Sequence, residues 1–255
     1  MKRFLPLLLA SAMMLVAAGA QAQFWAPGNY LTPNWDPATS PMLVDDGTGG
    51  DAVAGDGIFT ATVVVAAPGA WEFKITDAPD WNNGIWPITG NVWFNTTVAN
   101  EPVVFTFDTN PHGDGWEPDA MWPNTDHTLG ATYTVVGDVG SELGGADWDP
   151  AGPLLMHDDG LNGDATAGDG IFTFAGPVSL AGAYQWKVAV DGAWAHQYGT
   201  DGPTVNGATQ LFTVNNDGDE WIFELDTNTA RLRAMENAPV PTEARTWTQI
   251  KRDIR

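Results

Sequence analysis

Short runs that alternate apolar and polar residues recur along most of the sequence. A period of two is typical of a β-strand with one buried face, and turns rich in Gly, Pro, Asn and Asp separate the runs. Neither half of the chain carries a helical period longer than one turn. The pattern therefore predicts an all-β protein of short antiparallel strands. The clearest runs are 58–65, 71–75, 103–107, 171–178, 184–188 and 221–225.

The same pattern occurs twice, at an offset of 113 residues. Residues 35–74 align with 148–187 without a gap, and 21 of the 40 paired positions are identical. Each window begins with Trp-Asp-Pro-Ala and later contains Ala-Gly-Asp-Gly-Ile-Phe-Thr. Short strands over about 105 residues per copy predict an antiparallel, immunoglobulin-like sandwich. We expect two tandem β-sandwiches, at 23–115 and 131–235, joined by a linker at 116–130.

Alternation also assigns side chains to the two faces of each predicted sheet. The apolar, inward-facing residues are Trp71, Phe73 and Ile75 in the first copy and Tyr184, Trp186, Val188 and Val190 in the second. The outward-facing residues are then Glu72, Lys74 and Thr76, and Gln185, Lys187 and Ala189. Lys74 and Lys187 are thus predicted on the outer face at equivalent positions.

The two ends of the chain differ from the repeats. Residues 1–22 combine an early Lys-Arg pair, an apolar stretch and Ala-Gln-Ala, which predicts a cleaved signal peptide. We therefore expect a secreted protein, or one at the periplasm or cell surface. Residues 236–255 begin with a Pro-bearing linker and end in a basic segment with Trp247, Ile250 and Ile254 on one helical face. The hypothesis is that this tail is recognised by export or surface-attachment machinery; the alternative is a disordered terminus.

The amino-acid composition limits the classes of molecule that the protein is expected to bind. The sequence carries 32 acidic and 10 basic residues, for a net charge of −22. Such a charge repels phosphate backbones and anionic lipids, so nucleic acid is excluded as an expected partner. The 255 residues include no Cys and 13 Trp, so packing rather than disulfides must hold the fold. Indole rings pack protein cores, and they also stack on the apolar face of a sugar ring.

One segment resembles a known family. Residues 184–194, Tyr-Gln-Trp-Lys-Val-Ala-Val-Asp-Gly-Ala-Trp, resemble the central motif of glycogen- and starch-binding sandwich modules of the isoamylase N-terminal type. The stretch from His196 through Asn206 to Thr227 is similar to the related modules of bacterial pullulanases. The resemblance covers most of the second copy and, through the repeat, the first.

The resemblance implies an α-glucan site, in which two Trp rings stack on the sugar and a Lys and an Asn hydrogen-bond its hydroxyls. The matching positions are Trp148, Lys187, Trp194 and Asn206 in the second copy and Trp35, Lys74 and Trp81 in the first, with Asn91 as a further candidate. The first copy departs from the motif, because Asp77-Ala78-Pro79-Asp80 replaces the Asp-Gly turn. The alternative is that the repeated Trp residues cap the open ends of the sandwiches and that Lys pairs with a neighbouring Asp.

Each of two Gly-rich loops contains Asp residues spaced five positions apart. The candidate metal ligands are Asp46, Asp51 and Asp56, and Asp159, Asp164 and Asp169, with Asp45 and Asp158 beside them. Oxygen clusters of this kind suit calcium, although the spacing is not that of an EF-hand. The alternative is a series of Asx turns that need no ion. No cofactor is required, and calcium is an optional ligand.

Catalysis finds little support in the sequence. The four His residues (His112, His127, His157 and His196) do not recur at the offset of the repeat, and no nucleophile or zinc motif occurs. We therefore predict a protein that is not an enzyme. Two function classes remain: a secreted carbohydrate-binding protein that favours α-glucan, and a structural or surface-assembly protein whose sandwiches act as spacers.

Overall fold

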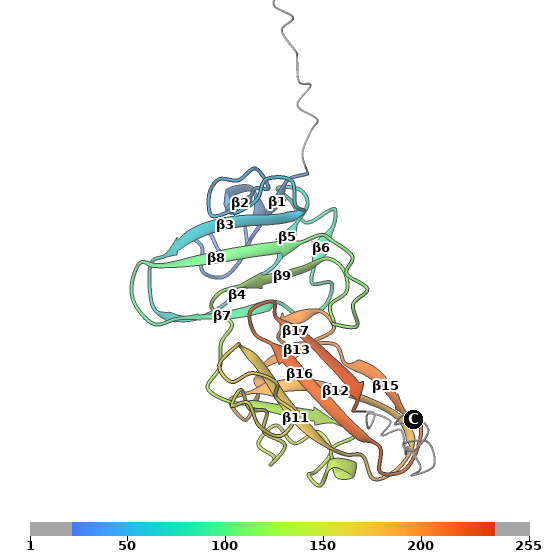
Figure 1. The fold of residues 1–255 in the computed structure, drawn as a ribbon. Helices are drawn as coiled ribbons and strands as arrows, with labels where there is room; N and C mark the ends of the chain where they lie inside the picture. The colour runs from blue at the N-terminus through green and yellow to red at the C-terminus, as the bar shows by residue number, and fades with distance from the viewer. Residues whose placement is uncertain (1–21, 238–255) are drawn as a thin grey trace, which may run out of the picture.

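The computed structural model in Figure 1 describes residues 22–237. Within this range the chain forms antiparallel strands and two short 3-10 helices, η1 (Pro37–Thr39) and η2 (Ser141–Leu143). The all-β fold predicted from the alternation is confirmed. None of the helices in this range is long and apolar enough to cross a membrane. The predicted signal peptide, except for Ala22, and the basic segment Arg245–Arg255 lie outside the described residues.

The first half places its core between sheets that lie face to face. One sheet has the order β2 (Met42–Leu43), β1 (Phe24–Trp25), β5 (Ile75–Thr76) and β6 (Ile85–Trp86). A second has the order β3 (Ile58–Val65), β8 (Glu101–Asp108) and β9 (Trp122–Thr125). Strands β4 (Gly69–Phe73) and β7 (Val92–Thr96) pair with each other. Phe73, Phe94 and Phe105 are fully buried between these layers.

The second half repeats this arrangement. Strands β11 (Ile171–Pro177), β16 (Glu220–Asp226) and β17 (Arg231–Glu236) form one sheet, in the position that β3, β8 and β9 have in the first half. The facing sheet contains β10 (Tyr133–Gly137), β12 (Gly182–Val190), β13 (Ala193–Gly199), β14 (Gly202–Thr204) and β15 (Gln210–Val214). Trp186, Val188 and Phe223 are fully buried between the two sheets.

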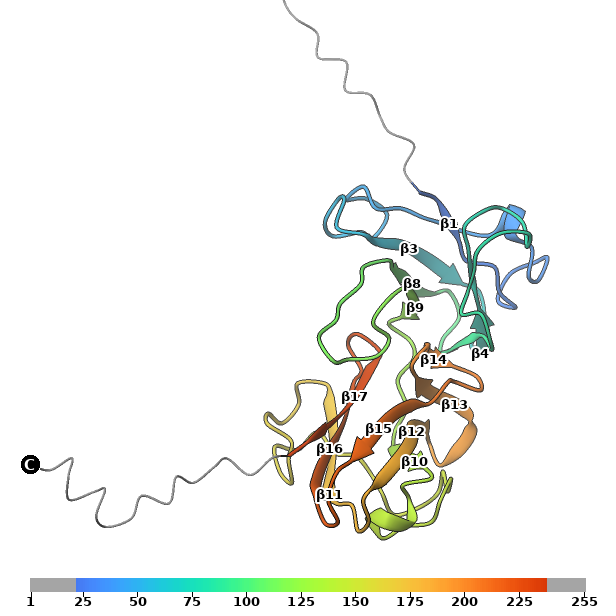
Figure 2. The same ribbon diagram turned by 90° about the vertical axis from the view of Figure 1, so that its right-hand side faces the viewer.

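One sheet runs through both halves. Strand β14 pairs with β7 through Thr204 and Val92, so the path β10-β12-β13-β14-β7-β4 is continuous. Figure 2 shows β14 and β4 at the same level, where the two halves meet. Trp93 of β7 is fully buried in the core cluster of the second half and donates its indole N–H to the Gln197 carbonyl at 3.1 Å. The halves therefore share both a sheet and a core residue.

Three details differ from the sequence expectations. Part of the expected linker 116–130 is strand β9, which pairs with β8 and so belongs to the first sandwich. Thr76, expected to point outward, is buried, and its hydroxyl donates to the Ala78 carbonyl at 2.8 Å. Ala189, also expected outside, is buried opposite Gln197 of β13. The inward positions of Phe73, Ile75, Trp186, Val188 and Val190 are confirmed by their burial.

Candidate functional site

A pocket of about 410 Å³ opens on the first half. Its aromatic wall is the pair Trp35 and Trp81, whose ring centroids lie 6.5 Å apart at an interplanar angle of 47°. The Trp81 indole N–H donates to the Trp35 carbonyl at 3.2 Å, yet 39% of Trp81 remains exposed. The two rings therefore form a supported apolar surface that solvent can reach. The pocket is lined by Asn29, Trp35, Glu72, Lys74, Trp81 and Asn91.

Local structure explains how Trp35 is held. The Asp36 carboxylate caps η1 by accepting the Ala38 N–H at 3.1 Å, and Pro37 at the first helical position suits this start. Just before the cap, the Trp35 N–H donates to the Gly28 carbonyl at 3.0 Å. Trp35 adopts a φ of +58°. The backbone on both sides of Trp35 is thus fixed before any ligand arrives.

Lys74 supplies the positive charge of the pocket. It follows β4 directly, and its ammonium donates to the Pro87 carbonyl at 2.6 Å. Burial lowers the pKa of Lys74, and the negative charge of Asp201 opposes this effect. An ammonium carries three N–H donors, so the bond to Pro87 leaves donors for a ligand.

Glu72 and Asn29 also line this pocket, and the sequence did not single them out. The Asn91 amide donates to the Glu72 carboxylate at 2.5 Å, and the Asn29 side-chain oxygen accepts the Glu72 N–H at 2.7 Å. The repeat held a signal for Glu72, because its equivalent at the offset of 113 is Gln185, another polar residue on the outer face. Asn91, a further candidate from the resemblance, does lie in the pocket.

The second half brings Lys187 and Trp194 together. The Lys187 ammonium lies 5.4 Å from the centre of the Trp194 ring and donates to the Gly207 carbonyl at 3.0 Å. Trp194 is 39% exposed, the same fraction as Trp81. Burial lowers the pKa of Lys187, again opposed by Asp201. The predicted Lys–Trp pair is therefore present as a cation held against an indole ring.

A bulge presents Trp194. After the Asp191-Gly192 turn, Val190 pairs with Ala193, but Ala189 already pairs with Gln197. Residues 194–196 are thus extra on the β13 side and project from the ladder. The Gln197 amide donates to the Trp194 carbonyl at 2.6 Å and fixes this bulge.

Asn206 and Trp148 are the two remaining residues that the sequence predicted for the site of the second half. Asn206 is exposed, has a φ of +65° and precedes Gly207, the residue that accepts from Lys187. Trp148 reproduces the backbone of Trp35, with a φ of +55° and an N–H bond of 3.0 Å to Gly137. However, residues 22–237 contain no ring contact between Trp148 and Trp194 like that of Trp35 with Trp81. The first half therefore carries the more complete aromatic pair.

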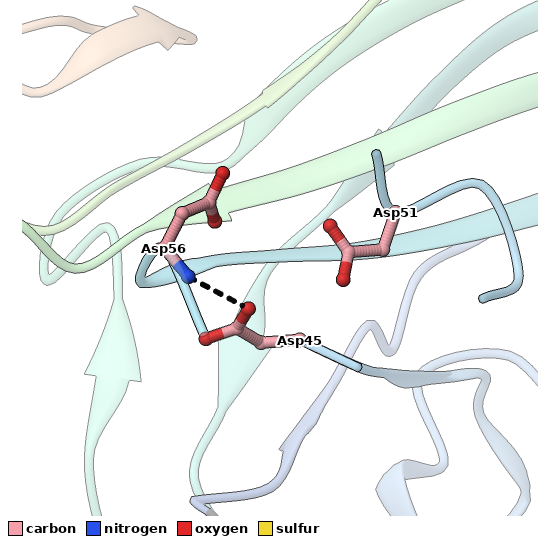
Figure 3. A group of neighbouring side chains, drawn as sticks. All are labelled: Asp45, Asp51 and Asp56. Atoms are coloured by element: carbon pink, nitrogen blue, oxygen red, sulfur yellow. Dashed lines mark hydrogen bonds between the residues drawn. The ribbon is translucent and has the colours of Figure 1, made fainter. Parts of the chain in front are cut away.

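The acidic loops form two clusters of carboxylates. In each cluster one oxygen of every member lies within 4.8 Å of the others. The members are Asp45, Asp51 and Asp56, shown in Figure 3, and Asp158, Asp164 and Asp169. Asp46 and Asp159, which the sequence also named, are not members of these two clusters; each is exposed and accepts a backbone N–H, from Thr48 and from Leu161 respectively.

Backbone N–H groups already use these carboxylates. Asp45 accepts from Gly55, Asp56 and Gly57, and the Gly47 N–H donates to Asp51 at 2.6 Å. The equivalent bond from the Gly160 N–H lowers the pKa of Asp164. The hydrogen bonds are those of the Asx-turn alternative. Calcium binding at these clusters stays a prediction.

The arrangement suits a neutral ligand with an apolar face and many hydroxyls. Exposed indole rings offer a flat apolar surface, while Lys, Asn and Glu side chains at their edges offer donors and acceptors. Because the lysine charges are partly buried and the protein is strongly acidic, an anionic ligand is disfavoured. The geometry therefore favours recognition by stacking and hydrogen bonding.

Parts of the chain are similar to known proteins. Residues 132–232 match the pullulanase X25 domain. The chain is 29% identical over 184 residues to an amylopullulanase of Thermoanaerobacterium saccharolyticum, and 29% over 185 residues to one of Thermoanaerobacterium thermosulfurigenes. Each alignment covers 70% of this chain but only 13% and 9% of those relatives. A pullulanase from Bacillus acidopullulyticus matches 52% of this chain and 16% of its own, at 22% identity and a TM-score of 0.32.

Proposed function

We propose that this chain is a non-catalytic carbohydrate-binding protein whose ligand is an α-glucan of the starch or glycogen type. The observation that carries the proposal is the pocket in which Trp35, Trp81 and Lys74 meet. The chain is similar to amylopullulanases, whose name refers to glucan-degrading enzymes, and this similarity supports the choice of α-glucan as the ligand. The leader pattern of residues 1–22 supports export, which would place the protein where polysaccharides occur.

In this proposal the indole rings bind the apolar face of a glucose ring. Trp81 and Trp194 are the exposed members, and a ring stacked on either would bury apolar surface on both partners. Lys74 and Lys187 donate to hydroxyl oxygens, since each ammonium has donors beyond its one backbone bond. Asn91 and Asn206 add amide groups at the edges of the two sites.

A structural role remains the second candidate, and one observation favours it. The shared sheet and the buried Trp93 join the halves, as a spacer in a surface assembly would require. A rigid spacer needs no exposed Trp beside a Lys, however. The two candidates therefore differ in whether Trp81 and Trp194 matter for binding sugar.

Sedimentation with insoluble starch tests the proposal. The wild-type protein should pellet with starch, and Trp81→Ala and Trp194→Ala should each weaken binding by about fivefold or more, because a lost stacking contact costs about 1–2 kcal/mol. Val64→Ala, an exposed apolar position on the opposite sheet of the first half, and Leu180→Ala, in the turn before β12, are the matched controls. Wild-type protein that stays in solution with every glucan tested would favour the spacer instead.

A further inference from the structure

The two candidate sites meet at the junction between the halves. The Val205 N–H donates to the Asn91 carbonyl at 2.8 Å, beside the Thr204–Val92 pair that joins β14 to β7. Asn91 lines the pocket of the first half. Asn206 follows Val205 directly and leads to the carbonyl that holds Lys187. A continuous series of contacts therefore runs from one candidate site to the other.

A second series of contacts joins the same sites through the bulge of β13. The His196 ring stacks on Trp93 with centroids 4.2 Å apart and an interplanar angle of 8°. Trp93 pairs in register with Glu72, which lines the first pocket. Trp194 is two residues from His196 in the same bulge. The bulge that presents one exposed indole is thus packed against β7, the strand that pairs with Glu72 of the other site.

The carboxylate of Asp201 interacts electrostatically with both Lys74 and Lys187. It sits in the turn between β13 and β14 and accepts from the Thr204 hydroxyl and the Ala208 N–H, each at 3.0 Å. Its negative charge raises the pKa of Lys74 and of Lys187 against the effect of burial. One carboxylate thus helps to keep both ammonium groups charged, and so able to donate.

We propose that the two sites form one extended surface that holds a single long glucan chain across both halves. This inference rests on the proposed carbohydrate-binding function and names its preferred ligand: an internal stretch of a long chain, rather than a short oligosaccharide. Because the shared sheet joins the halves that carry Trp81 and Trp194, a chain bound at one site presents its next units to the other. The second contact is then intramolecular, and linked contacts of this kind raise affinity without any new residue.

Calorimetric titration of the whole protein with malto-oligosaccharides of increasing length tests the inference. Affinity should rise at least about tenfold between oligosaccharides of about four and about ten units. Long oligosaccharides should bind with one molecule per protein chain. Trp81→Ala and Trp194→Ala should each abolish the gain with length, while a short oligosaccharide still binds the intact site. Leu180→Ala should keep the gain, and melting curves should show that all three variants are folded.

Each other outcome overturns the inference in a recognisable way. Two long oligosaccharides per chain, with no gain in affinity with length, would show two separate sites and leave the proposed function intact. Loss of the gain in only one of the two Trp variants would place the whole ligand on one half. Absence of binding at every length would reject this inference and the proposed function together.

Discussion

A single aspartate organises each glycine-rich loop. The Asp45 carboxylate accepts three successive backbone N–H groups, from Gly55, Asp56 and Gly57. Asp158 does the same with Gly168, Asp169 and Gly170. These glycines include positions with positive φ, among them Gly55 at +77° and Gly57 at +83°, which other residues rarely adopt. The loop shape therefore depends on one charge and on the absence of side chains at two positions.

Replacing Asp45 should destabilise the fold. Asp45 is 7% exposed, and Asp45→Ala would leave three N–H groups without their acceptor, at a cost of about 2–4 kcal/mol. Denaturation by guanidinium chloride measures the change. Asp46→Ala is the matched control: Asp46 is exposed and serves only the turn to Thr48, so about 1 kcal/mol or less is expected. Equal losses in both variants would contradict the role given to Asp45.

His196 should make stability depend on pH. Burial lowers the pKa of His196 below 6.5, opposed by the charges of Asp191 and Glu72. The unfolded chain therefore takes up a proton first on acidification. The stability that depends on neutral His196 is fully present above about pH 6.5 and is lost as the pH falls through the folded pKa.

Melting temperatures at pH 7.5 and pH 5 measure this dependence. The wild type should lose more stability between the two values than His196→Gln, which cannot titrate. Other groups titrate equally in both proteins, so the difference isolates His196. Identical losses would show that protonation of His196 carries no cost.

At the scale of strands, alternation was a good guide where each strand has one buried and one open face. It placed Trp186 and Val188 in the core and Lys187 outside, as found. It failed at Thr76 and Ala189, which are fully buried although the alternation places them on the outer face. Period-two patterns carry no information about what lies over the outer face. The pairing of β14 with β7 was likewise not predictable from local sequence.

At the candidate site, too, the sequence did not predict contacts between distant segments. The repeat and the resemblance marked Trp81 and Lys74, which the structure brings into one pocket. They did not mark Asp201, whose influence on both lysines depends on how the halves pack. The sequence repeat and the resemblance thus marked Trp and Lys residues that recur at the offset of 113. Residues brought in by the junction were not marked.

The acidic loops also give a prediction at the scale of whole elements. Each carboxylate in the clusters of Asp45 and Asp158 already accepts backbone N–H groups. We therefore expect millimolar calcium to raise the melting temperature by no more than a few degrees, as for a weak site that only the folded state offers. Thermal unfolding in calcium and in EDTA measures the shift. A rise of more than about ten degrees that EDTA reverses would show a strong site.

At the scale of the whole molecule, Arg231 joins the second half to the loop between β8 and β9 of the first half. Its guanidinium makes two bonds to the Asp114 carboxylate, of 2.8 and 2.7 Å, and donates to the carbonyls of Pro118 and Trp116. Arg231 is only 6% exposed. These hydrogen bonds from Arg231 hold the pKa of Asp114 well below its usual 3.8, so their contribution is present above that pH and lost on acidification below it.

Arg231→Ala should therefore cost about 2–3 kcal/mol, because two carbonyls lose a donor, while the 44% exposed Asp114 carboxylate can be hydrated in its place. Arg231→Lys keeps the charge but not the planar fork, so a smaller loss is expected. Because the halves share a sheet, we expect one calorimetric transition in the wild type and two separate transitions in the alanine variant. A change of less than about 1 kcal/mol would show that the shared sheet alone holds the junction.

The shared sheet has a consequence for any attempt to divide this chain. A cut within 116–130 would follow the sequence repeat, but it would take β14 away from β7 and leave Trp93 without the core that buries it. The first half would then carry an unpaired strand edge beside an exposed indole. Such an edge is a template for pairing with another molecule. The unit that repeats in the sequence is therefore smaller than the unit that is fit to be expressed alone.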